Sequence, residues 1–90
     1  MTLLEQIRAS IRECLDTRAG HMAVIDSVIA AAEARDDSAL TDAETIQFSE
    51  ARSAVAAADA DLAQLQEREA ELVALEEARA AADAVAARPP

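Results

Sequence analysis

The chain has 90 residues, with eight basic and 18 acidic side chains, a formal net charge of −10, one Phe as its only aromatic residue and one Cys. This length allows at most one small domain, and the acidic balance argues against nucleic-acid binding, which needs a basic face to neutralise phosphates. A single Cys excludes an internal disulfide. Because no apolar run approaches about 20 residues, we expect neither a signal peptide nor a transmembrane span.

The first predicted helix covers about residues 3–35. Thr2 and Glu5 have the spacing of a capping box, in which two side chains satisfy free amides at a helix start. Apolar residues then recur at intervals near 3.6, which predicts an amphipathic helix. Gly20 interrupts the pattern, so the segment forms either one kinked helix or two helices. The residues predicted to face the second helix are Leu4, Ile7, Ile11, Leu15, Ile25 and Ile29.

The second predicted helix follows a short connector at residues 36–40, which is rich in residues that favour turns and caps. Thr41 and Glu44 form a second capping-box pattern, and no Gly or Pro follows until Pro89. A helix is therefore predicted over about residues 41–88, with 89–90 starting a linker. Two long helices joined by a short connector predict an all-α fold, a long helical hairpin or coiled coil that forms one domain over residues 1–88.

One line of apolar residues along the second helix follows alternating steps of three and four. This heptad spacing is typical of left-handed helix pairs. The line is narrow and rich in Ala, so it buries little area, and we expect weak pairing and a marginally stable chain that is helped by self-association or by a partner. The large residues of this predicted hairpin and self-association line are Phe48, Val55, Leu62, Leu65 and Leu72.

The sequence offers little chemistry. Cys14 and His21 are separated by about 10 Å along a helix, too far to share a metal ion. His21, Asp26 and Ser27 are the residue types of a catalytic triad, but no Gly-rich elbow or oxyanion loop accompanies them. The acidic residues do not converge on one point as a carboxylate metal site requires. We therefore expect no enzyme, no cofactor and no catalytic or metal-binding residues.

The residues from 35 to 65 resemble a known family. Arg35, the sequence Leu40-Thr41-x-x-Glu44 and the spaced Phe48, Val55, Leu62 and Leu65 are similar to the N-terminal scaffolding region, or delta domain, of Hong Kong-type tailed-phage major capsid proteins. The resemblance implies a structural protein that guides procapsid assembly by weak self-association. It implies a location inside the phage procapsid, in the cytoplasm of a bacterial host. The implied partners are further copies of the chain and capsid subunits, and a maturation protease is implied to remove the segment. We expect it to bind neither nucleic acid nor a membrane.

Some features depart from that family. The connector after Arg35 is longer than usual, Ser49 stands where an acid is common after Phe48, and the shell-forming domain is missing from these 90 residues. An unrelated coiled-coil adaptor or small regulator that binds one partner protein is therefore the alternative interpretation. Only the resemblance of the stretch from Leu40 to Phe48 to the delta domain favours the scaffold over the adaptor.

Overall fold

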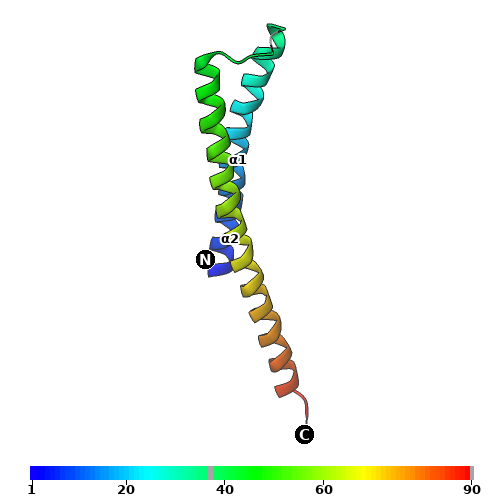
Figure 1. Ribbon diagram of the computed structural model, residues 1–90. Helices are drawn as coiled ribbons and strands as arrows, with labels where there is room; N and C mark the ends of the chain where they lie inside the picture. The colour runs from blue at the N-terminus through cyan, green and yellow to red at the C-terminus, as the bar shows by residue number, and fades with distance from the viewer. Residues whose placement is uncertain (37, 90) are drawn as a thin grey trace.

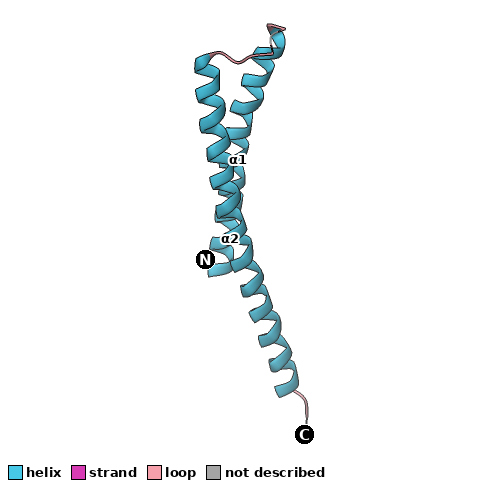
Figure 2. Cartoon of the chain, viewed as in Figure 1, coloured by secondary structure: helices cyan, strands magenta, loops and turns pink. Residues whose placement is uncertain are grey.

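The computed structural model describes residues 1–36 and 38–89, and they form two long helices. Helix α1 spans Leu3–Ala34 with 32 residues, and helix α2 spans Asp42–Ala86 with 45 residues (Figure 1). The described residues contain no strand (Figure 2). The molecule is a rod of 77 × 18 × 17 Å, which confirms the predicted all-α helical hairpin.

The two helices run antiparallel in a fixed register. Arg8 pairs with Glu69 at 3.1 Å, and Arg18 pairs with Asp59 at 2.6 Å. A step of ten residues forward along α1 is thus matched by a step of ten residues back along α2. Helix α2 continues beyond the start of α1 (Figure 1), and no described residue from 74 onward is buried. We call residues 74–86 of α2 the overhang.

The core between the helices is thin and apolar. Each buried residue of α2 lies on the predicted heptad line. The buried residues of α1 also follow a seven-residue repeat, since Leu4 and Ile7 lie three heptads before Ile25 and Val28. No polar side chain is buried among the described residues. The fold therefore depends on one narrow line of contacts rather than on a broad core. The buried residues are Leu4, Ile7, Ile25, Val28 and Ala32 of α1, and Ala51 and Ala58 of α2.

The predicted contacts of α1 were wrong at Leu15 and Ile29, whose side chains are 46% and 41% exposed. The half-buried Cys14 and the buried Val28 occupy those positions instead. The reason is the period. Helices that coil around one another keep a repeat of seven residues in contact, whereas the pattern of an isolated helix drifts by about 20° in each heptad. Reading α1 at 3.6 residues per turn therefore moved the predicted line by one residue.

Helix α1 runs unbroken through Gly20, so the segment is one helix and not two. Apart from its chain neighbours and the backbone of its own helix, a methyl group added at Gly20 would meet no atom within 4 Å. Gly20→Ala is therefore expected to stabilise the chain by about 0.5–1 kcal/mol, because Ala loses less backbone entropy in a helix. Thermal unfolding followed by circular dichroism measures this change. A lower midpoint in the variant would contradict the open surroundings of Gly20.

The ends of the helices lie close to their predicted positions. Arg35 caps α1, one residue after its end at Ala34, and α2 ends at Ala86, two residues before the predicted boundary. Asp36 has a φ of 53°, in the left-handed region where Asp is tolerated better than most residues. The chain thereby leaves the helix direction at the start of the connector. Asp37 of the predicted connector and Pro90 of the predicted linker lie outside the described residues.

Candidate interaction surfaces

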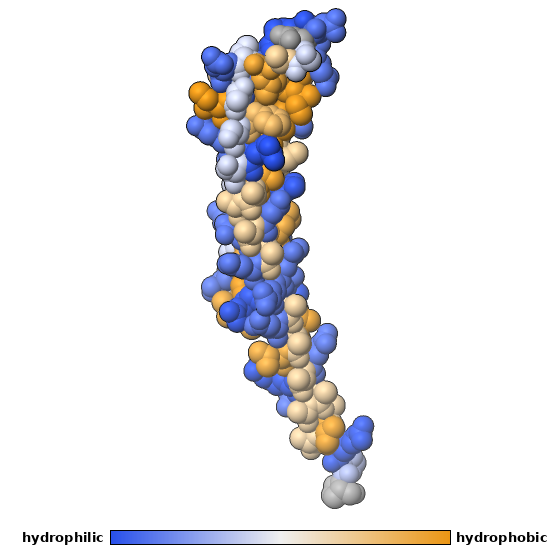
Figure 3. Space-filling view, in the orientation of Figure 1, coloured by the Kyte–Doolittle hydropathy of each residue, from blue (hydrophilic) through white to orange (hydrophobic). Residues whose placement is uncertain are grey.

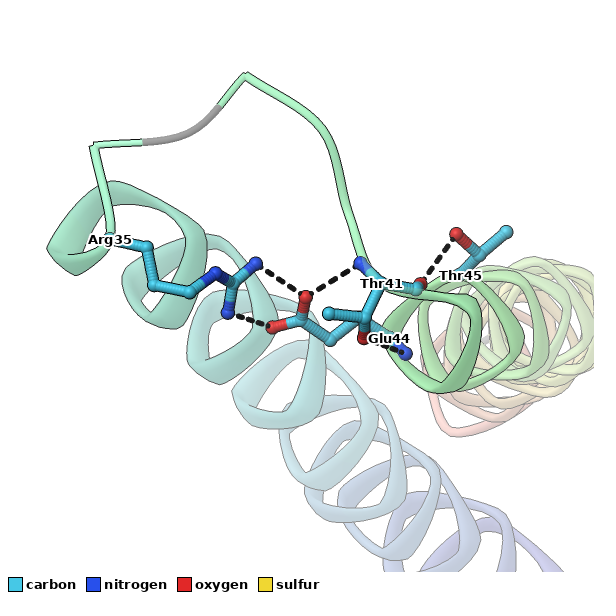
Figure 4. A network of polar contacts seen from close by, with 4 residues as sticks. All are labelled: Arg35, Thr41, Glu44 and Thr45. Carbon is cyan, nitrogen blue, oxygen red and sulfur yellow. Dashed lines mark hydrogen bonds and ion pairs between the residues drawn. The ribbon is translucent and has the colours of Figure 1, made fainter.

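The start of α2 is tied to the end of α1 by a cluster of charged and polar groups (Figure 4). Glu44 accepts a hydrogen bond from the Thr41 amide at 2.9 Å, and its own amide donates to the Thr41 hydroxyl at 3.1 Å, so the predicted capping box is complete. Arg35 donates to both oxygens of the same carboxylate, at 2.9 and 2.6 Å. This two-pronged geometry is the strong form of an Arg–carboxylate pair, and it closes the connector end of the hairpin.

These contacts change the acidity of Glu44. Its pKa falls from an ordinary 4.5 to about 2, chiefly because Arg35 donates to the carboxylate and then because the Thr41 amide does. Both donors favour the charged form. The resulting stabilisation is complete above the unfolded-state pKa near 4.5 and is lost as the pH falls towards about 2.

Acid titration with a Glu44→Gln control tests this contribution. Gln keeps one acceptor for the Thr41 amide but removes the charge and one of the two oxygens that accept from Arg35. We expect the wild type to have the higher unfolding midpoint at neutral pH, and the difference between the two proteins to shrink between pH 4.5 and about 2. Comparing the two proteins cancels the effect of protonating the other acids. A difference that stays constant over this range would show that the Glu44 charge is not linked to folding.

The first cap is simpler than predicted. The Glu5 amide donates to the Thr2 hydroxyl at 3.1 Å, so Thr2 caps α1. The Glu5 carboxylate accepts from the same hydroxyl at 3.0 Å, in place of the Thr2 amide that a full capping box would use. Thr2 and Glu5 therefore form only half of the predicted capping box.

The residues predicted for self-association lie on the side of α2 that faces α1. They are half-buried and alternate with the buried Ala51 and Ala58. Phe48 is covered in part by Arg52, whose guanidinium carbon lies 5.9 Å from the ring centre. The line is engaged within the single chain, so contacts between folded hairpins must use other surfaces. The residues concerned are Phe48, Val55, Leu62, Leu65 and Leu72.

A shallow groove of about 780 Å³ lies along one side of the contact between the helices. Small residues of α2 leave this space open, and the sulfur of Cys14 approaches the carbonyl oxygen of Ala58 at 3.2 Å. His21 also lines the groove. Among the described residues, no three His, Cys, Asp or Glu side chains are placed to hold a metal ion together. Charged side chains also line the groove, at Glu13, Asp61 and Arg68.

Large apolar side chains remain uncovered along the rod. They include Leu15 and Ile29 of α1, Ile46 of α2, and Leu75 and Val85 of the overhang, with exposures from 41% to 62%. Figure 3 shows apolar surface both over the hairpin and over the C-terminal part of α2. A two-helix fold can cover only one stripe of each helix, so these side chains are free to contact another molecule.

In comparisons with known proteins, no family model matches the chain, and neither a curated protein nor a solved structure matches it. Within residues 1–36 and 38–89, no helix has a stretch long and apolar enough to cross a lipid bilayer.

Proposed function

We propose that this chain is a structural segment that guides assembly by weak association between copies of its helical hairpin. The observation that carries the proposal is the set of large apolar side chains left uncovered after the hairpin has formed, including Leu15, Ile29 and Leu75 at 41–58% exposure. Scattered contacts of this kind are weak individually. Tethering many copies to one assembly raises their effective concentration and lets weak contacts act together.

The setting we propose is the interior of a tailed-phage procapsid in a bacterial host. The resemblance of residues 35–65 to the delta domain supports it, and the cluster of Arg35, Thr41 and Glu44 gives the resembling residues a common role in closing the hairpin. The net charge of −10 suits a temporary occupant, because it repels incoming DNA and favours removal by a maturation protease before packaging. On this proposal the chain binds copies of itself and capsid subunits and catalyses nothing.

Counting closed shells tests the function. The Val28→Asp change is made in the gene that encodes this chain. If that gene does not also encode the shell domain, it is expressed together with the shell protein. Val24→Asp is the matched control. Val28 is 4% exposed and Val24 is 39% exposed, so only the first change is expected to disrupt the hairpin. The proposal expects aberrant or missing shells with Val28→Asp and normal shells with Val24→Asp. Normal numbers of closed shells with both would overturn the scaffold role.

The reading frame beyond Pro90 separates the scaffold from the adaptor. A shell-forming domain following Pro90 supports the scaffold. A stop codon, with no effect of Val28→Asp on any shell, favours a coiled-coil adaptor that binds one partner protein. The overhang is the feature that suits such an adaptor, since Leu75 and Val85 are 58% and 62% exposed on the part of α2 that extends past the start of α1 (Figure 1).

A further inference from the structure

A straight apolar stripe remains on one flank of α1. Leu15, Met22 and Ile29 are seven residues apart, which is two helical turns or about 10 Å, so their side chains fall in line along the helix. Leu15 and Ile29 are 46% and 41% exposed, and Met22 is half-buried. We call these three residues the docking stripe. It lies beside the line that faces α2 and stays accessible when the hairpin is formed.

We propose that the docking stripe binds the docking stripe of a second copy, with the two α1 helices antiparallel and related by a two-fold axis at Met22. This inference rests on the proposed self-association and names the surface that carries it. Leu15 and Ile29 are each seven residues from Met22. A two-fold axis at Met22 therefore sets Leu15 of each copy against Ile29 of the other and sets the two Met22 side chains together, as a self-complementary interface requires.

Charged residues beside the stripe select the antiparallel orientation. Arg12 lies three residues before Leu15 and Glu33 four residues after Ile29, so both flank the stripe on the same side. They stand ten and eleven residues from Met22, in opposite directions. The antiparallel pair therefore brings Arg12 of each copy opposite Glu33 of the other, twice per dimer. In a parallel pair, the two-fold axis would run along the helices and place Arg12 and Glu33 of the two copies on opposite sides of the interface, so neither Arg12–Glu33 pair would form.

Both charges are available for such contacts. Arg12 and Glu33 are exposed, and neither takes part in any ion pair or side-chain hydrogen bond of the described residues. Asp26 flanks the stripe on the same side, and the antiparallel arrangement places it near Ala19 of the second copy rather than near another Asp26. The flank thus contains two attractive Arg12–Glu33 pairs, in a chain whose net charge of −10 otherwise opposes association.

The size of the stripe sets the strength of the contact. Three partly exposed side chains in each copy bury far less than the roughly 800 Å² per partner of a stable, specific interface. The dimer is therefore weak and reversible. An assembly segment that must later be removed requires contacts of this strength, because a tight helix pair would hold the segments together inside the closed shell and oppose their removal.

Cysteine cross-linking tests the geometry. With Cys14 replaced by Ser, Met22→Cys is expected to form a disulfide-linked dimer rapidly, because the two-fold axis brings the two thiols together. Ala23→Cys is the matched control, since its side chain points about 100° away on the same helix and is expected to react slowly. In a mixture of Leu15→Cys and Ile29→Cys chains, dimers joining position 15 to position 29 are expected to exceed both like-to-like dimers. A majority of like-to-like dimers would overturn the antiparallel orientation.

A charge exchange tests the stripe without changing an apolar residue. Arg12→Glu and Glu33→Arg are each expected to weaken association roughly tenfold, since each variant places like charges together twice per dimer. The double variant restores the attraction with reversed signs and is expected to recover the wild-type Kd. Both positions are exposed, so the fold is retained, and circular dichroism checks this.

The outcomes separate this inference from the proposed function. If the wild type associates but the exchanges leave its Kd unchanged and position 22 cross-links no faster than position 23, another surface carries the association and the docking stripe is wrong. If the wild type remains monomeric at every concentration, the stripe and the proposed self-association both fail.

Discussion

Val28→Asp is expected to abolish the folded hairpin. Val28 is 4% exposed, which is the lowest exposure among the core residues, and it lies on the line of α1 that faces α2. An unpaired carboxylate at such a position costs about 3 kcal/mol or more. The buried core contains only a few apolar residues, so the chain has little stability to lose. Circular dichroism and urea unfolding measure the loss of helicity and of the free energy of unfolding.

Val24→Asp is the matched control for this prediction. It makes the same substitution one helical turn earlier on the same helix, where the side chain is 39% exposed. The free energy of unfolding is expected to change by no more than about 0.5 kcal/mol. A wild-type midpoint for Val28→Asp would show that Val28 does not lie between the helices, and the hairpin arrangement would then be wrong.

The second large effect is expected at Ile25. Ile25→Ala removes a buried side chain from the line between the helices and is expected to cost about 2–4 kcal/mol. Ile29→Ala removes the same atoms from a side chain that is 41% exposed and is expected to cost less than about 1 kcal/mol. Unfolding is measured at low protein concentration, so that contacts between copies do not contribute.

This pair of variants tests the phase of α1 directly. The pattern of apolar residues alone placed both Ile25 and Ile29 against α2. The structure keeps Ile25 and turns Ile29 outward. Equal costs for the two variants would restore the original prediction and contradict the seven-residue repeat of α1.

The fold class and the start of α2 could be predicted because their causes are local. Thr41 and Glu44 are three residues apart, so their hydrogen bonds depend on the chain near the helix start and on nothing distant. The residues that follow favour helix individually, and the lack of Gly and Pro leaves nothing to end the helix before Ala86.

The choice between Cys14 and Leu15 could not be made in this way. Both residues fit an amphipathic helix, and the neighbouring apolar positions allow either phase. Only the coiling of α1 around α2, over a contact of many turns, selects the seven-residue repeat and thereby Cys14. That coiling is a property of the pair of helices, and the spacing of residues within one helix does not specify it.

The pairs between the helices were also missed. Arg8–Glu69, Arg18–Asp59 and Arg35–Glu44 depend on the register of an antiparallel pair, which the connector sets. A signal was present, because each Arg faces an acid once the helices are aligned from the connector outward. The heptad line of α2 has a related ambiguity, since the same apolar residues serve pairing within one chain or between chains.

The central claim is that folded hairpins associate weakly with one another. Sedimentation equilibrium of the whole chain from about 10 µM to 1 mM, with helicity recorded over the same range, tests it most directly. The expected result is a reversible monomer–dimer equilibrium with a Kd inside that range and a constant helicity, because each hairpin folds from its own two helices. A strict monomer throughout would contradict the self-association. Helicity that falls as the dimer dissociates would contradict the hairpin itself and show helices that pair only between chains.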